Sequence, residues 1–210
     1  MNPQAATVYE KTNTVGFIYD TDVKKPALLL HSCCGPCCTS VVEDLIHSYA
    51  VTVYFYNPNI TDPSEYEKRI ESQKKYIEQF NSRLNRPDTL AFIEGAYEPE
   101  RFFDEVKGFE KEPEGGERCK ICFRMRLEKT AETASIMGFD CFAATLSVSP
   151  HKSCETIGGL GRDISMRYSV GFIDRDFKKD GGYQRSIELS KQYSLYRQDY
   201  CGCEFSKGGK

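Results

Sequence analysis

The chain has 210 residues, of which 28% are charged, and its formal net charge is −3 at pH 7. This length suits one domain with a buried core, and no apolar run approaches the ~20 residues that a membrane helix needs. Residues 1–26 lack the apolar stretch of a secretory signal, so they are predicted to form an N-terminal extension. We therefore expect a cytoplasmic domain over residues 27–210 that does not associate with a membrane.

The first half of the chain alternates short apolar runs with segments of helical periodicity. Residues 27–31 form an apolar run that ends at Ser32 and continues into two cysteines and a Gly-Pro pair. This pattern predicts a buried strand followed by a cysteine-rich loop. The other elements predicted in this half are strands at 51–56 and 89–93 and helices at 39–49, 64–84 and 99–106.

The second half continues the alternation. An apolar stripe at helical spacing from Phe123 to Ala134 predicts a helix over 119–137 that ends at Gly138. Strands that alternate with helices predict a single α/β domain with a mostly parallel sheet, whose loops meet in a crevice at the carboxyl edge. The remaining predicted elements are strands at 142–146 and 170–173, a glycine-rich stretch at 158–161 before a helix that ends near 168, and a helix over 184–193.

Ten cysteines are the most informative feature of the composition. Eight of them fall in three groups, at 33–38, 119–122 and 201–203. A disulfide scaffold is disfavoured, because such scaffolds belong to small secreted domains. The alternatives are structural zinc and an iron–sulfur or redox centre, and the presence of only three histidines disfavours mixed Cys/His zinc sites. Structural roles are predicted for Cys38, Cys141 and Cys154.

Two of these groups together provide four thiolates, the number that a [4Fe–4S] cluster takes. Cys33 and Cys34 follow the first predicted strand. Cys119 and Cys122 open a predicted helix, whose N-terminus favours thiolate formation. These four are the candidate cluster ligands, and Cys37 is either a ligand for a second metal or a packing residue.

The third group lies near the C-terminus. Cys201 and Cys203 are separated by one glycine. A disulfide between them would close a strained small ring, and strained disulfides are labile, so this pair is a candidate redox-active catalytic pair. The alternative is that it ligates the cluster in place of Cys33 and Cys34.

Basic and aromatic residues are interleaved between residues 152 and 197. The pattern predicts either a solvated surface or a phosphate-contacting rim beside stacking aromatics, as an RNA loop binder needs. The basic members are Lys152, Arg162, Arg167, Arg175, Lys178, Lys179, Arg185 and Arg197, and the aromatic members are Phe172, Phe177, Tyr183 and Tyr196.

Several segments form an ordered pattern between Leu28 and Cys203. They are LLLHSCCGPC, NPNI followed by EYEKR, GERCKICFRMRL, TLSVSPHK, GGYQRSIELSK and LYRQDYCGC. Together they resemble the cobalamin-independent epoxyqueuosine reductase family, QueH. The resemblance implies a Rossmann-like fold similar to the adenine nucleotide α-hydrolases.

The resemblance also implies an activity, the final step of queuosine biosynthesis. Epoxyqueuosine would be reduced to queuosine at the wobble position of the tRNAs for Asp, Asn, His and Tyr. The partners would be the anticodon loop of the tRNA and an unidentified electron donor. The implied [4Fe–4S] ligands are Cys33, Cys34, Cys119 and Cys122, and the implied redox pair is Cys201 and Cys203.

The chemistry of this reaction requires a cofactor. Removal of an epoxide oxygen to leave an alkene takes two electrons and two protons, which side chains alone cannot supply. The Lewis acid for that oxygen would be either the cluster or an additional iron bound through Cys37. Asp176, His151 and Tyr183 are candidates for the general acid. The competing hypotheses are a zinc-thiolate RNA-binding module without redox turnover and a dithiol oxidoreductase that acts on proteins.

Overall fold

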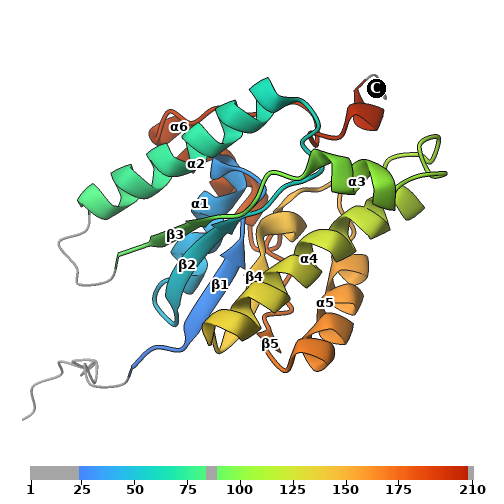
Figure 1. Cartoon of the computed structure of the whole chain (residues 1–210). Coiled ribbons are helices and arrows are strands. Elements are labelled where there is room, and N and C mark those ends of the chain that lie inside the picture. The colour runs from blue at the N-terminus through green and yellow to red at the C-terminus, as the bar shows by residue number, and fades with distance from the viewer. Residues whose placement is uncertain (1–23, 84–88, 208–210) are drawn as a thin grey trace, which may run out of the picture.

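A computed structural model describes residues 24–83 and 89–207 (Figure 1). The predicted extension 1–26 therefore lies outside the described residues, apart from its last three. The strands are β1 (Ala27–His31), β2 (Ala50–Phe55), β3 (Ala91–Glu94), β4 (Cys141–Ala144) and β5 (Gly171–Phe172). The helices are α1 (Gly35–Leu45), α2 (Pro63–Arg83), α3 (Pro99–Glu105), α4 (Glu117–Met137), α5 (Cys154–Tyr168) and α6 (Gly182–Gln192), with 3-10 turns η1 (Thr145–Val148) and η2 (Glu204–Ser206).

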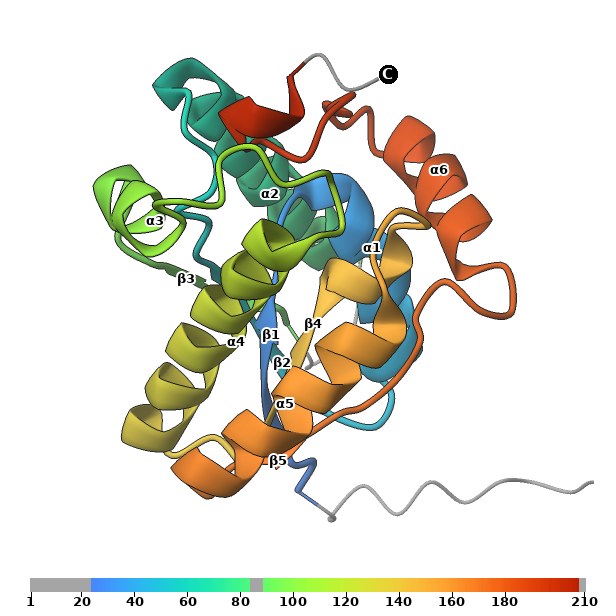
Figure 2. The same cartoon turned by 90° about the vertical axis from the view of Figure 1, so that its right-hand side faces the viewer.

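The five strands form one sheet in the order β3-β2-β1-β4-β5, and every pairing is parallel. Helices α1, α2 and α6 cover one face and α4 and α5 cover the other (Figures 1 and 2). This winding from a central first strand is the Rossmann-like arrangement. The predicted single α/β domain is confirmed. None of the described helices combines the length and hydropathy needed to cross a bilayer.

The central strand β1 explains the unbroken apolar run at 27–31. Leu28 and Leu30 pack with residues of α1, α2 and α6, whereas Leu29 packs with residues of α4 and α5. All three leucine side chains are fully buried. Successive side chains of a strand point to opposite faces, and helices cover both faces of a parallel sheet, so both kinds of position must be apolar.

Helix α1 begins at Gly35, four residues before the predicted start, and ends at Leu45. Proline near the start of a helix is tolerated because that position needs no N–H donor, so Pro36 begins the helix rather than blocking it. A Cβ atom at Gly35 would lie 2.9 Å from the carbonyl oxygen of Ser72 on α2. The cysteine-rich loop is therefore shorter than predicted, and Cys37 and Cys38 lie on the helix.

The predicted glycine-rich stretch at 158–161 also lies on a helix, α5. A Cβ atom at Gly161 would overlap the ring of Phe172 on β5. Gly159, on the same helix, faces open space. The glycine at 161 thus lets α5 approach the edge strand closely, a requirement of packing that overrides the low helix propensity of glycine.

We expect Gly161→Ala to lower the free energy of unfolding by about 1–3 kcal/mol, because the added methyl group must displace an aromatic ring. Gly159→Ala is the matched control and should raise it by up to about 1 kcal/mol, because alanine favours the helix and meets no neighbour. Urea denaturation followed by circular dichroism measures both values. Equal effects at the two positions would contradict the close packing at Gly161.

Candidate functional site

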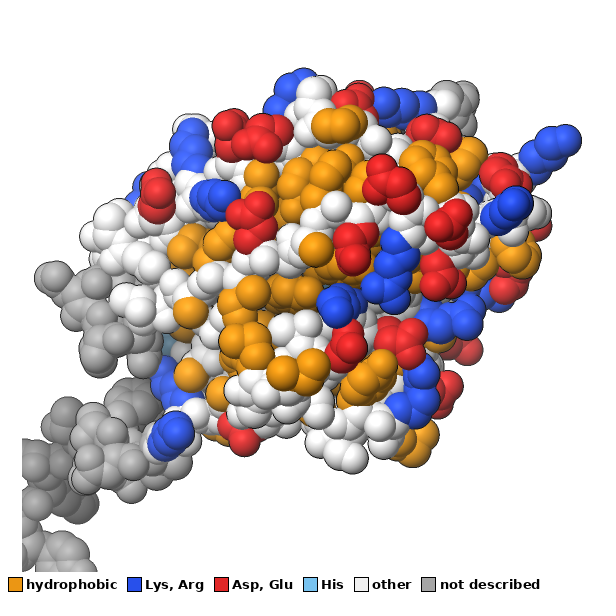
Figure 3. All heavy atoms as spheres, viewed as in Figure 1, with side chains coloured by type: hydrophobic (Ala, Val, Ile, Leu, Met, Phe, Trp, Pro, Cys, Tyr) orange, Lys and Arg blue, Asp and Glu red, His pale blue; other side chains and the backbone are white. Residues whose placement is uncertain are grey.

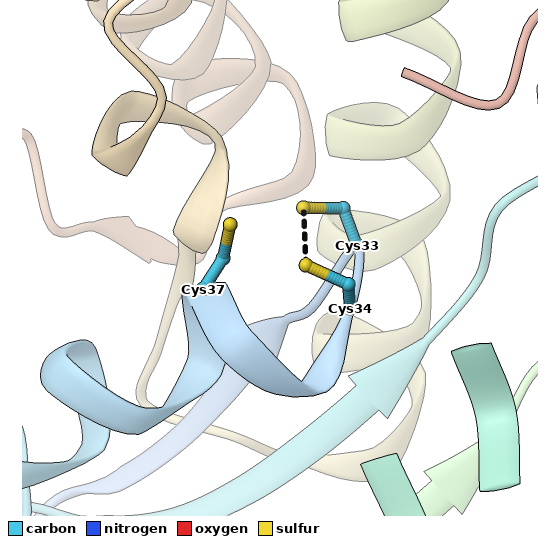
Figure 4. A group of neighbouring side chains, drawn as sticks. All are labelled: Cys33, Cys34 and Cys37. Atoms are coloured by element: carbon cyan, nitrogen blue, oxygen red, sulfur yellow. Dashed lines mark hydrogen bonds between the residues drawn. The ribbon is translucent and has the colours of Figure 1, made fainter. Parts of the chain in front are cut away.

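The first cysteine group lies at the carboxyl edge of the sheet, directly after β1. Cys33 and Cys34 occupy the loop before α1, and Cys37 lies in the first turn of that helix. Their three Sγ atoms lie within 4.8 Å of one another, and Figure 4 shows them facing a common space. The Cys33 and Cys34 sulfur atoms are 3.9 Å apart. Three soft donors at this spacing could hold a metal ion.

The other two groups line one pocket at the same edge. Cys119 and Cys122 reach it from the start of α4, and Cys201 and Cys203 from the C-terminal segment. The loops after β2 and β4 contribute Asn59, His151 and Lys152, and the remaining walls include Arg118 and Arg126. The predicted convergence of these loops is therefore observed.

The start of α4 connects the first group to the pocket. Cys119 packs against the hydrophobic cluster that contains Cys33 and Cys34. Cys122 belongs with Cys203 to a separate cluster around Phe102 of α3. Among the described residues only Cys33, Cys34 and Cys37 have three donor atoms at single-ion spacing. The α4 pair lies outside that group, and Cys119 is the member of the pair that packs toward it.

Hydrogen bonding favours one thiolate in the first cysteine group and one in the C-terminal pair. Hydrogen bonds from Cys34 and Cys37 hold the pKa of Cys33 well below its usual value, although burial opposes this. The same contact with Cys33 raises the pKa of Cys34 to about 11. In the C-terminal pair, the hydrogen bond from Cys203 lowers the pKa of Cys201 to about 5. Each of these two groups therefore has one thiol that loses its proton more readily than its neighbours, and a thiolate is the form that binds metal or reacts as a nucleophile.

His31 is not arranged as a ligand. It is fully buried, and its Nε2 donates to the carbonyl oxygen of Tyr56 at 2.9 Å. Burial, with the nearby Arg126 charge, lowers its pKa to about 4. His31 is therefore a neutral, buried side chain that packs at the end of β1, directly before the cysteine loop.

Helix α2 holds the C-terminal segment in place. The buried Arg69 donates from Nη1 to the carbonyl oxygen of Cys201 and from Nη2 to that of Tyr200, both at 3.0 Å. Its Nε donates to Oε1 of Glu65 at 2.6 Å. Sequence reasoning missed this clamp, because arginine is usually exposed and nothing local marks Arg69 as buried.

Two further features shape the segment that carries Cys201. Gly202 has φ +104°, and a Cβ atom there would lie 2.9 Å from Ile60, so both conformation and space require glycine. Gln198 donates from Nε2 to Sγ of Cys34 at 3.0 Å. The segment that carries Cys201 and Cys203 is thus hydrogen-bonded to the first cysteine group through Gln198.

The remaining cysteines lie away from the pocket. Cys38 is fully buried in the core, Cys141 is buried in β4, and Cys154 is half-buried at the start of α5. All ten cysteines fall within the described residues, and none forms a disulfide there.

The predicted basic rim is largely neutralised. Five of its eight basic residues form ion pairs with carboxylates, which lowers the free charge available to a phosphate backbone. These pairs are Arg162–Asp174, Arg167–Glu128, Arg175–Asp44, Lys178–Asp176 and Arg185–Glu43. Figure 3 shows acidic and basic side chains interspersed over one face. Of the three candidate general acids, His151 alone lines the cysteine pocket.

The fold and the site together define an α/β protein with a group of three thiols that could hold a metal ion. Residues 28–208 match the family model described as epoxyqueuosine reductase QueH, and the chain belongs to that family, whose name denotes an oxidoreductase.

Relatives that carry this name support the assignment. The Streptococcus pyogenes serotype M1 protein is 39% identical over 98% of this chain and 80% of its own length. The Staphylococcus epidermidis protein is 42% identical over 90% of this chain and 79% of its own length. The Haemophilus influenzae protein is 42% identical over 85% of this chain and 71% of its own length.

Proposed function

We propose that the protein reduces epoxyqueuosine to queuosine at the wobble position of tRNA, the final step of queuosine biosynthesis. The observation that carries this proposal is the meeting of three cysteine groups at one edge of the sheet in a member of this family. The substrate is the anticodon loop of the tRNAs for Asp, Asn, His and Tyr, which places the reaction in the cytoplasm. An unidentified donor supplies the electrons.

The proposed cofactor is a [4Fe–4S] cluster held by Cys33, Cys34, Cys119 and Cys122. A thiolate-ligated cluster is anionic, and the site supplies positive charge for it. Among the described residues, no carboxylate forms an ion pair with the pocket-lining cations Arg126 and Lys152. When bound, the cluster supplies electrons one at a time.

The side chains around the cluster have separate tasks in this scheme. Cys201 and Cys203 store two electrons as a dithiol and form a disulfide when they release them. His151 lines the pocket and would supply one of the two protons of the water that the epoxide oxygen becomes, while the other is released when the Cys201 thiolate and the Cys203 thiol form their disulfide. Cys37, the third thiol of the first group, is the proposed ligand for an additional iron, a Lewis acid for the epoxide oxygen.

Anaerobic purification followed by a visible spectrum and an iron and zinc count tests the cofactor. We expect a brown protein with about four irons per chain, or about five if Cys37 holds another. Incubation with epoxyqueuosine-containing tRNA and dithionite should then yield queuosine, detected by mass spectrometry of the digested nucleosides. A colourless protein with stoichiometric zinc and no iron would instead support the zinc-thiolate RNA-binding module.

A further inference from the structure

Arg126 is a buried cation for which the described residues provide no carboxylate partner. It lies on α4, four residues after Cys122, and only 2% of its side chain is exposed. A buried charge is costly unless an opposite charge or hydrogen bonds compensate it. A negative charge close to Arg126 would therefore stabilise its buried guanidinium.

The contacts of Arg126 direct its charge at a cysteine sulfur. Its Nη2 donates to Sγ of Cys122 at 3.1 Å, and its Nε donates to the carbonyl oxygen of the same residue at 3.1 Å. The guanidinium also lies 5.6 Å from the ring centroid of Phe123. These contacts hold the positive charge in one position, directed at a cysteine sulfur that lines the pocket.

A second cation reinforces this arrangement. Lys152 lines the same pocket as Arg126 and Cys122, and it reaches the pocket from the loop before α5. Burial disfavours a charge on Lys152, but the nearby sulfur atoms of Cys33 and Cys37 help to raise its pKa above the usual value. Two cations from different elements thus face the same sulfur-rich space.

We propose that Arg126 is a positioning residue that raises the reduction potential of the iron–sulfur centre. This inference rests on the proposed function. A [4Fe–4S] cube with four thiolates is a dianion, and one electron from a reductant such as dithionite makes it a trianion. Net charge and hydrogen bonds to sulfur set the potentials of such clusters. A fixed cation that donates to Sγ of Cys122 stabilises the trianion more than the dianion.

Anaerobic redox titration of the iron-loaded protein, followed by electron paramagnetic resonance, tests this role. Arg126→Gln should lower the equilibrium constant for one-electron reduction at least tenfold, a potential decrease of about 59 mV or more. Arg126→Lys keeps the charge, so its reduction potential should lie between those of Arg126→Gln and the parent protein. Arg124→Gln removes the same charge from the exposed side of α4. Its equilibrium constant for one-electron reduction should stay within twofold of the parent value.

An iron-loaded Arg126→Gln protein with a parental potential would overturn the inference and leave Arg126 a structural role. If that variant loses its iron, Arg126→Lys carries the test, because it keeps a charge at this position but replaces the guanidinium that donates to Sγ of Cys122. Its potential should fall in the same direction, and an unchanged value would count against the proposal.

The two proposals fail in distinguishable ways. A parent protein without iron would overturn the cofactor proposal and this inference together. An iron-bearing parent that shows the expected potential shifts but does not reduce epoxyqueuosine would overturn only the proposed function.

Discussion

Cys119→Ser is expected to remove both the brown chromophore and the turnover of the protein. Cys119 packs against the hydrophobic core cluster that contains Cys33 and Cys34. Its sulfur accepts a hydrogen bond from the N–H of Gly115 at 3.2 Å. Serine offers a hard oxygen where an iron–sulfur cluster takes a soft thiolate. The loss of activity should exceed the roughly 10–100-fold that removal of an outer-shell partner costs.

The measurement is iron per chain, the visible spectrum and the rate of queuosine formation in the same anaerobic preparation. Cys154→Ser is the matched control, because Cys154 is half-buried at the start of α5 and does not line the cysteine pocket. It should retain iron, colour and rate. A brown, fully active Cys119→Ser protein would show that this thiol is not a ligand.

Cys201→Ser is expected to retain the iron and lose turnover. In the proposed scheme Cys201 stores and releases electrons with Cys203 and does not ligate the cluster. The hydrogen bond from Cys203 lowers the pKa of Cys201 to about 5, so its thiolate predominates at neutral pH. The thiolate is lost as the pH falls through about 5, and activity that depends on it should decline over the same range.

Iron counts decide between the two ligand sets that the residues allow. Loss of iron in Cys201→Ser would move this residue into the ligand set, since it lines the same pocket as Cys119 and Cys122. Cys33→Ser would then be expected to keep its iron. Cys203→Ser should match Cys201→Ser, with iron retained and turnover lost, if the pair acts as a dithiol.

The local pattern determined most of the fold. The run at 27–31 is uniformly apolar because the central strand of a parallel sheet is covered on both faces, so its position and type follow from local composition. The stripe from Phe123 to Ala134 marks the buried face of α4 for a similar reason. The early start of α1 was missed because Gly35-Pro36 resembles a turn, whereas the close approach of α2 at Ser72 makes it a helix start.

The features of the site likewise include some that the sequence predicts and others that depend on how the elements pack. The grouping of the thiols is evident along the chain, and the alternation of strands and helices predicts that their loops meet at the carboxyl edge, because that alternation gives the strand direction. The packing of the elements is needed to see that Cys37 faces Cys33 and Cys34, and that Arg69 and Arg126 are buried beside the cysteine groups. It also paired most of the basic rim with carboxylates distant in the sequence, as in Arg185 with Glu43. Burial and ion pairing depend on which elements pack together, and the packing partners of an element cannot be deduced from residue spacing along the chain.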